Sequence, residues 1–214
     1  MVSDPLILSL DTTAAHCAAA LLSGTRVLAH RFEPMAKGQA ERLMPMVEEI
    51  LGETDKAPTD LDAIAVCTGP GNFTGIRIAV AAARGLALSL GIPAIGASRL
   101  EALAFGFDQP VAALLDGRQD HVFEQSFKHG KPVGNPVLIP IENLPDGADY
   151  VTLAGDLDHV VLLNRTRVAP ENVVLNIARI AAGKLGQDNP RPAPVYVRSA
   201  NAALPSEPPP TLLP

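Results

Sequence analysis

The 214-residue sequence has no tryptophan, few aromatic residues (4%) and only two cysteines. Two cysteines do not form a disulfide framework, and we expect Cys17 and Cys67 to be small buried strand residues rather than nucleophiles. No apolar run approaches the roughly 18 residues that a membrane span needs, and the opening residues do not resemble a signal peptide. The composition excludes a disulfide-stabilised secreted domain and predicts a cytoplasmic protein that does not enter the membrane.

Positive charge is also scarce. Lys and Arg number 17 against 23 Asp and Glu, which gives a formal net charge of −6. A protein that binds nucleic acid unaided usually presents a basic face, because phosphate contacts supply much of the affinity. The sequence contains no Lys/Arg cluster of that kind, so we expect any tRNA to be held indirectly, through a partner.

What is present favours a globular α/β protein. Apolar residues make up 47% and charged residues 19%, and the length suffices for one large domain or two small lobes. An N-terminal lobe is predicted at 1–107. Its apolar patterns predict strands at 6–10, 16–22, 26–32, 62–67 and 94–96 and helices at 39–51, 74–90 and 98–106.

A smaller C-terminal lobe is predicted at 108–198. Its patterns predict strands at 111–115, 121–127, 151–154 and 160–163, an irregular or edge strand at 131–140, and a helix at 171–185. The strand–Asp–turn–strand pattern of residues 6–22 recurs at 111–127, which suggests a duplicated architecture. The proline-rich tail at 199–214 is expected to be disordered.

The loop at 68–77, Thr-Gly-Pro-Gly-Asn-Phe-Thr-Gly-Ile-Arg, joins a predicted buried strand to a helix. Its glycines allow close backbone approach, and Asn72 or Thr74 can cap the helix. Amide groups at such a helix start can bind anions, but the spacing matches neither a Walker A loop nor a dinucleotide fingerprint. The residues alone leave two alternatives, an anion-binding loop and a rigid turn without a ligand.

This loop resembles the GPGSFTG-type segment of the TsaB family (also called YeaZ), with Asn72 where serine is usual. Other segments resemble the family in the same order, at 7–13, 40–47, 85–87, 92–93, 98–104, 116–118 and, as a closing strand, 194–198. Gln39 departs from the histidine that many relatives carry before the first helix. The resemblance implies an α/β protein with the actin/sugar-kinase/Hsp70-like ATPase fold (ribonuclease H-like) in two lobes.

The resemblance also implies a function. It predicts a non-catalytic partner subunit for the threonylcarbamoyl modification of adenosine 37 in tRNAs that read codons beginning with A. Such a subunit binds TsaD as a heterodimer, helps to recruit the small ATPase TsaE, and forms a homodimer when alone. Two alternatives stay open: a small ATP-dependent kinase or peptidase of the same fold, and a stand-alone homodimeric binding module.

The catalytic relative TsaD, by the same resemblance, carries two histidines four residues apart, a spacing that lets both imidazoles reach one metal ion. No two of the five histidines in this sequence are four residues apart (His16, His30, His121, His129 and His159). We therefore predict neither a metal site nor a catalytic residue. Asp11 and Asp116 follow the first predicted strand of each lobe, as remnants of a nucleotide cleft or as residues that order a turn.

A candidate nucleotide or anion site follows from the loop and the first turn. We expect it to bind ATP or ADP weakly at most, with no cofactor bound stoichiometrically. Its candidate residues are Asp11, Thr12, Thr13, Gly69, Gly71, Asn72, Thr74 and Gly75.

A candidate partner interface lies on the predicted helices at 39–51 and 74–90, which carry more apolar residues than one inward stripe needs. Its candidate residues are Arg42, Leu43, Met46, Val47, Ile76, Ala79, Ala82, Ala83 and Leu86. We expect Met46→Asp or Ala82→Glu to weaken association and leave the monomer folded. The alternative is that the second lobe covers both helices.

Overall fold

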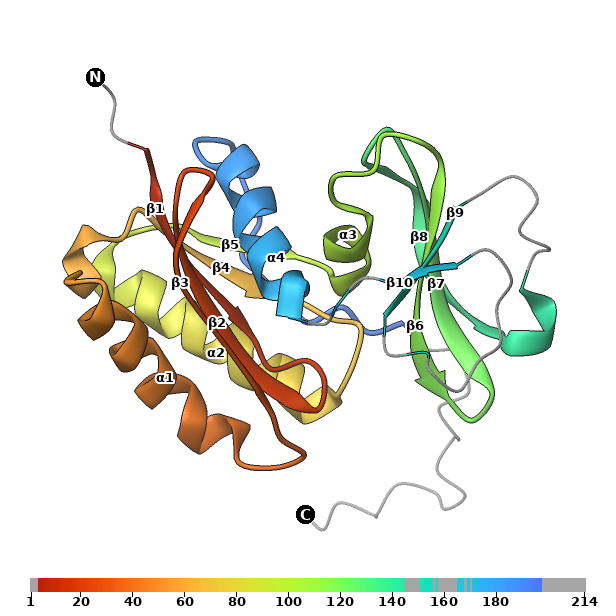
Figure 1. Ribbon diagram of the computed structural model, residues 1–214, viewed down its shortest axis with the longest axis horizontal. Coiled ribbons are helices and arrows are strands. Elements are labelled where there is room, and N and C mark those ends of the chain that lie inside the picture. Colours follow the sequence, from red (N-terminus) through yellow and green to blue (C-terminus); the bar gives the residue numbers. More distant parts are fainter. Residues whose placement is uncertain are drawn as a thin grey trace, which may run out of the picture.

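A computed structural model of the chain describes residues 4–144, 151–155, 157, 165–167, 169 and 171–197 (Figure 1). Three expectations lie outside these residues: the strand at 160–163, the environment of His159, and the tail at 199–214. The described chain forms two mixed sheets with helices packed around them.

The first sheet has the strand order β3-β2-β1-β4-β5. Its strands are β1 (Leu6–Asp11), β2 (His16–Ser23), β3 (Arg26–Pro34), β4 (Ala63–Cys67) and β5 (Ala94–Ala97). The first three form an antiparallel meander, and β4 and β5 run parallel to β1. Every residue of β1 and β4 is buried, as expected for inner strands that are covered on both faces.

Two long helices cover one face of this sheet, α1 (Gln39–Glu53) and α2 (Phe73–Leu90), and a short 3₁₀ turn, η1 (Pro58–Asp60), follows α1. Pro45 lies inside α1, so the helix runs through it. Gly91 adopts the left-handed conformation, with φ of 67°, and ends α2 where the sequence predicts. By length and composition α2 is apolar enough to cross a membrane, but its inner side packs on the sheet.

The second sheet repeats the first, in the order β8-β7-β6-β9-β10. Its strands are β6 (Val111–Arg118), β7 (His121–Lys128), β8 (Lys131–Pro140), β9 (Val151–Gly155) and β10 (Arg165–Arg167), with a 3₁₀ turn, η2 (Ile141–Asn143), after β8. The pattern of antiparallel and parallel pairs is the same. The predicted duplication and the actin-like fold class are therefore confirmed, and β8 is the predicted edge strand.

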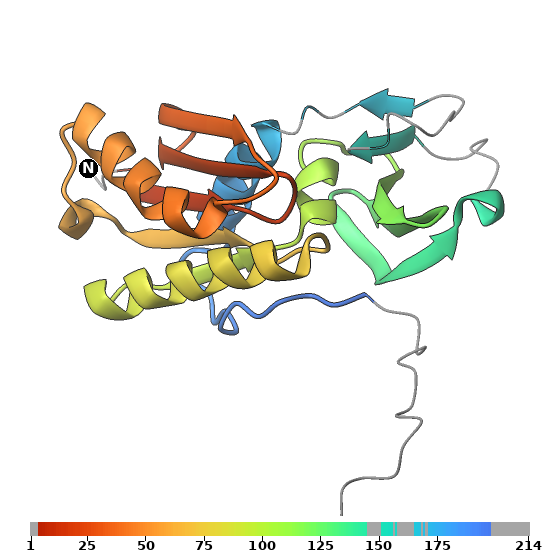
Figure 2. The same ribbon diagram turned by 90° about the horizontal axis from the view of Figure 1, so that it is seen from below.

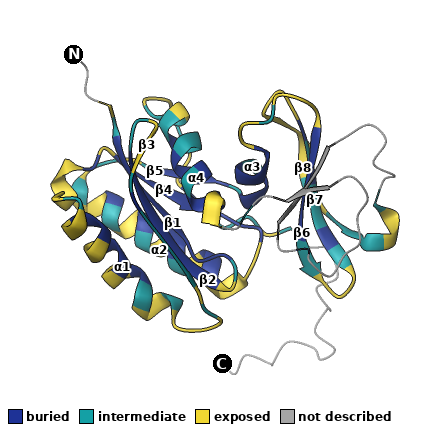
Figure 3. Ribbon diagram, in the orientation of Figure 1, coloured by how far each residue is buried: buried dark blue, intermediate teal, exposed yellow. Residues whose placement is uncertain are grey.

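The helix that follows each sheet crosses to the other one. Helix α3 (Arg99–Ala104) contacts β6, β7 and β9, while α4 (Glu171–Lys184) packs on β1, β2, β4 and β5. A hydrogen bond from Asn176 to the Ala102 carbonyl joins the two helices at 2.8 Å. The sequence places 171–185 in the C-terminal lobe, whereas the structure packs α4 on the first sheet, with one side of the helix buried in the core (Figure 3).

Beyond α4 the chain returns along α2. We call residues 191–197 the strap; it runs beside α2 on the side away from α1 (Figure 2). The Val195 N–H donates to the Thr68 carbonyl at 2.8 Å. The predicted closing strand at 194–198 is wrong for its described residues, because 194–197 are extended but form no strand. The strap nevertheless fixes one border of the α2 surface.

Candidate functional site

The glycine loop is fixed from inside the protein. The Asn72 side chain caps α2 and accepts hydrogen bonds from the amides of Thr74 and Gly75, both at 3.0 Å. The Asn72 amide in turn donates to the Thr13 carbonyl at 2.7 Å. The prediction that Asn72 or Thr74 caps the helix is confirmed for Asn72. Three amides at this helix start, those of Asn72, Thr74 and Gly75, therefore donate within the chain.

The loop also packs closely against the turn after β1. A Cβ added at Gly75 would overlap the Thr12 carbonyl oxygen, and one added at Gly71 would overlap the Thr13 carbonyl oxygen. The Thr12 hydroxyl donates to the Gly75 carbonyl at 2.6 Å. The candidate nucleotide residues are therefore brought together, as the sequence predicts. Gly71 and Gly75 lie directly against the Thr12–Thr13 backbone, and this contact requires glycine at both positions.

Asp11 is the buried centre of this turn. Its Oδ1 accepts hydrogen bonds from the Thr13 amide at 2.8 Å and the Thr13 hydroxyl at 2.6 Å, and its Oδ2 lies 3.1 Å from His16 Nε2. Burial raises the pKa of the Asp11 carboxyl, but His16, Arg99 and the Thr13 hydroxyl outweigh it and hold that pKa well below its usual value. This geometry matches the turn-ordering alternative for Asp11.

Asp116 holds the corresponding position in the second sheet. Its Oδ1 accepts a hydrogen bond from the Arg118 amide at 2.8 Å, which orders the turn between β6 and β7. The side chain is half-buried. Both acidic residues that the sequence singles out therefore bind the backbone of their own turns.

Both cysteines are buried, as predicted. Burial raises the pKa of the Cys17 thiol to about 12 and that of the Cys67 thiol well above its usual value. A thiol held protonated in this way is a poor nucleophile. Within the described ranges no three His, Cys, Asp or Glu side chains gather into a group that could hold a metal ion.

The predicted interface is largely wrong, because most of its residues point inward. Six of them are buried against the first sheet, namely Leu43, Met46, Val47, Ile76, Ala79 and Ala83. The sheet presents small side chains to α1, such as Cys17, whose Sγ lies 4.0 Å from Met46 Sδ. The small side chains leave space for a wider buried apolar stripe on α1 than the sequence predicts. Met46→Asp would therefore place a carboxylate in the core.

The other three predicted interface residues are partly exposed. Ala82 and Leu86 lie at the edge of the core. Arg42 forms ion pairs with Glu33 and Glu49, at 2.6 and 2.7 Å. These contacts connect α1 to β3 within the chain, so they give Arg42 a local role.

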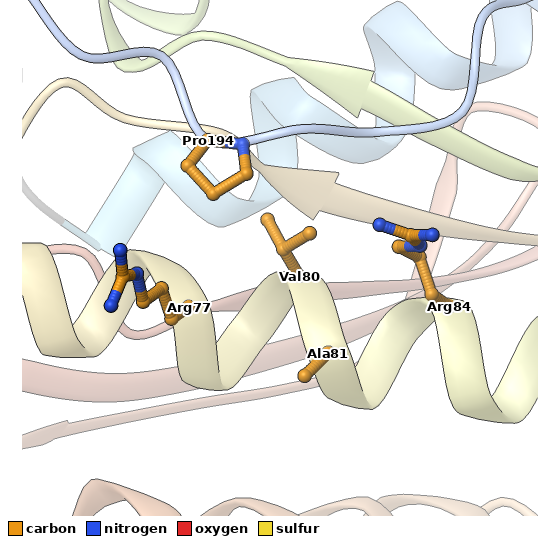
Figure 4. A pocket seen from close by; sticks show the side chains of 5 residues that line it. All are labelled: Arg77, Val80, Ala81, Arg84 and Pro194. Carbon is orange, nitrogen blue, oxygen red and sulfur yellow. The ribbon is translucent and has the colours of Figure 1, made fainter. Parts of the chain in front are cut away.

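The true outer surface of α2 is a different stripe, which we call the α2 stripe: Phe73, Arg77, Ala81, Arg84 and Leu88. These residues recur at helical spacing and all are exposed, with Leu88 at 80%. A shallow groove of about 370 Å³ lies between α2 and the strap (Figure 4). Its lining residues are Arg77, Val80, Ala81, Arg84 and Pro194. Most of the α2 residues predicted to form the interface face the sheet instead, so the prediction does not include this stripe.

An aromatic cluster surrounds Arg77, which is one of the residues that line this groove. The Arg77 guanidinium lies 3.7 Å from the centroid of the Phe73 ring, and its Nε–H donates to the Tyr196 hydroxyl at 2.8 Å. The two rings lie 5.1 Å apart. No sequence signal connects Tyr196 to Phe73 and Arg77, because the contact depends on the return of the strap to α2.

Comparison with known proteins gives consistent matches. The TsaD family, described as tRNA N6-adenosine threonylcarbamoyltransferase, matches residues 32–137. A Bacillus subtilis protein named tRNA threonylcarbamoyladenosine biosynthesis protein TsaB is 32% identical over 193 residues, which cover 87% of this chain and 83% of that protein. The Escherichia coli protein of the same name is 38% identical over 122 residues, 55% of this chain and 52% of that protein.

A solved structure agrees with these sequences. YeaZ from Pseudomonas aeruginosa aligns with a TM-score of 0.74 at 29% identity, over 90% of this chain and all of that chain. A second structure from the same organism, described as similar to the peptidase YeaZ, aligns equally well, at 30% identity and over 91% of this chain. The sequence motifs, the duplicated fold and these matches together place the chain in the TsaB family, whose named members take part in the biosynthesis of threonylcarbamoyladenosine in tRNA.

Proposed function

We propose that this chain is a non-catalytic subunit of a tRNA-modifying assembly, in which it binds a TsaD-type protein and helps to recruit TsaE. The match to the B. subtilis TsaB protein over most of both chains carries the proposal. The assembly acts in the cytoplasm and attaches the threonylcarbamoyl group to adenosine 37 of tRNAs that read codons beginning with A. The net charge of −6 supports an indirect contact with tRNA.

The packing of the glycine loop supports a role without catalysis. The amides of Asn72, Thr74 and Gly75 already have acceptors within the chain, so a phosphate group would have to displace those contacts. We therefore propose that ATP or ADP binds weakly at most. The buried thiols argue against a cysteine peptidase, although one solved relative is described as similar to a peptidase.

The outer faces of α1 and α2 are the proposed partner surface. Phe73 and Leu88 are exposed there at 46% and 80%, and exposed apolar side chains in a row usually mark a binding site. The region that matches the TsaD family, residues 32–137, contains both helices. A TsaD-type partner therefore brings equivalent helices to the contact, and a second copy of this chain does so when TsaD is absent.

Ala81→Glu tests the surface, because Ala81 is exposed in the middle of the α2 stripe. We expect binding to the TsaD-type protein of the same cell, measured by calorimetry, to weaken at least about tenfold through charge and steric conflict. The melting temperature should stay within about 2 °C of the wild type. Ala57→Glu, at an exposed alanine before η1, is the matched control and should bind normally.

The cellular role is tested in a strain that has lost its own TsaB relative. Mass spectrometry of bulk tRNA should show threonylcarbamoyladenosine restored by the wild-type chain and by Ala57→Glu, but reduced with Ala81→Glu. The purified chain alone should make no modified nucleoside and hydrolyse little ATP. Failure of the wild-type chain to bind TsaD and to restore the nucleoside would overturn the proposal, as would vigorous turnover by the chain alone.

A further inference from the structure

The groove between α2 and the strap is positively charged at both ends of an apolar floor. Figure 4 shows Arg77 and Arg84 on either side of Val80, with Pro194 of the strap across from them. The two arginines are seven residues apart on one helix, which is about two turns or roughly 10 Å. Within the described ranges neither forms an ion pair, Arg84 forms no hydrogen bond, and Arg77 bonds only a tyrosine hydroxyl.

No acidic residue belongs to either wall of the groove. Helix α2 and the strap contain three arginines, Arg77, Arg84 and Arg191, and no Asp or Glu, although the whole chain has a net charge of −6. Helix α1, by contrast, carries four glutamates and one arginine. Because salt at 0.1 M screens surface charges beyond about 10 Å, a ligand in the groove meets these arginines more strongly than the net charge. The groove therefore favours an anionic ligand.

Arg77 is held in place before any ligand binds. Its guanidinium lies 3.7 Å from the centroid of the Phe73 ring and 5.8 Å from that of the Tyr196 ring, and its Nε–H donates to the Tyr196 hydroxyl at 2.8 Å. A guanidinium ordered in this way loses little conformational freedom when it binds a carboxylate. Its two terminal NH₂ groups form no hydrogen bond with a described residue, so they can bind a carboxylate in two-pronged fashion.

The size of the groove selects the form of the ligand. The groove holds about 370 Å³, whereas two turns of a helix about 10 to 12 Å across fill on the order of 1,000 Å³. An extended chain is narrower and advances about 3.3 Å per residue. Two acidic residues about three positions apart in an extended chain can therefore reach both arginines, with small apolar residues between them over Val80 and Ala81.

We propose that the groove between α2 and the strap binds an extended acidic segment of a protein partner, with one carboxylate at Arg77 and another at Arg84. The proposal rests on the function proposed above, because the groove borders the proposed partner surface on the side of α2 away from α1 (Figure 2). The apolar floor and the net charge of −6 favour a peptide over a nucleic acid, whose binding usually needs a broad basic face. The strap supplies one wall through Pro194 and orients Arg77 through Tyr196.

A labelled peptide, Glu-Glu-Ala-Ala-Glu-Glu, tests the charge of the groove on the full-length chain. We expect fluorescence anisotropy in about 50 mM salt to give a dissociation constant below about 1 mM, and no binding of the matching glutamine peptide. Arg84→Glu should weaken binding at least about tenfold. The matched control is Arg26→Glu, at an exposed arginine of β3 without an ion pair in the described ranges. It changes the net charge equally and should bind within about twofold of the wild type.

Conservative variants test the part played by the strap. Arg77→Lys keeps the charge but loses the planar group that stacks on Phe73, so we expect the peptide to bind about tenfold more weakly, against less than about threefold for Arg84→Lys. Tyr196→Phe keeps the ring and removes the hydroxyl, and should weaken binding about threefold. Equal effects of the two lysine variants would overturn the role of the strap.

Equal effects of Arg84→Glu and Arg26→Glu on peptide binding would overturn the proposal, as would the absence of binding at millimolar peptide. Tighter binding of hexauridylate or of ADP than of the peptide would also overturn it, because the groove would then serve a nucleic acid or a nucleotide. These outcomes leave the proposed function intact, since association of the wild-type chain with TsaD tests that separately. Peptide binding without any association with TsaD would overturn the proposed function alone.

Discussion

At the glycine loop, the amides of Asn72, Thr74 and Gly75 all donate to acceptors of the same chain. On the outer faces of α1 and α2, by contrast, Glu48 and Arg84 have no charged partner among the described residues. Both regions meet at the start of α2, but the loop is held by contacts within the chain, whereas the helix faces leave large apolar side chains such as Phe73 and Leu88 exposed. Because exposed apolar side chains in a row usually mark a binding site, the comparison directs attention away from the loop and toward the helices.

The largest expected effect on stability comes from comparing the same substitution at two methionines of α1. Met46 is completely buried and Met44 is exposed at 37%. Met46→Asp places an unpaired charge in the core, so we expect a loss of about 4 kcal/mol or more in the free energy of unfolding. Met44→Asp should change it by less than about 0.5 kcal/mol. Urea unfolding followed by circular dichroism measures both.

The same pair separates folding from association. Met44→Asp should remain a folded monomer that no longer self-associates, because its carboxylate would lie within the partner surface proposed for the outer face of α1. A stable Met46→Asp protein would show that the core of α1 is looser than the burial of its residues indicates. Normal self-association of Met44→Asp would exclude α1 from the contact.

Helices α1 and α2 show how much of the structure can be predicted from the sequence. Their existence and their approximate ends follow from apolar spacing and from Gly91. The outward side could not be assigned, because the width of the buried stripe depends on side chains of another element, such as Cys17 on β2. The packing of α4 on the first sheet and the contact of Tyr196 with Arg77 each join residues that are far apart in the sequence. Local patterns do not contain such pairings.

The next largest effect concerns two glycines of α2 that the structure treats differently. A Cβ at Gly75 would overlap the Thr12 carbonyl, whereas a Cβ at Gly85 would meet no atom within 4 Å. We expect Gly75→Ala to lower the free energy of unfolding by about 3 kcal/mol, because backbone must shift. Gly85→Ala should raise it by about 0.5 kcal/mol through better helix propensity.

Thermal unfolding of the two glycine variants in parallel measures this difference. If Gly75→Ala is as stable as the wild type, the turn at Thr12 is free to move away from the loop. The space between them would then be available to an anion, and the contrast between a closed loop and an open helix face would disappear.

The smallest effect concerns Asp11, at the end of β1, and Asp116, at the turn between β6 and β7. Asp11→Asn removes a buried charge from beside His16 and Arg99, so we expect a loss of about 2 to 3 kcal/mol at pH 7. Asp116→Asn, at the half-buried turn of the second lobe, should cost less than about 1 kcal/mol, because an amide oxygen can still accept the Arg118 amide. The two turns share a position in the duplicated fold, but only one carries a buried charge.

The pH dependence of unfolding distinguishes charge from shape at Asp11. The pKa of Asp11 is lower in the folded chain than in the unfolded chain. Its ionisation therefore stabilises the fold fully above the unfolded value of about 3.9, and this contribution is lost as the pH falls through the folded value. The difference in unfolding free energy between wild type and Asp11→Asn should be constant from pH 7 to about 5 and shrink below about 4. A difference that stays constant down to pH 3 would mean that Asp11 acts through its shape and hydrogen bonds, so that its turn is held no differently from that of Asp116.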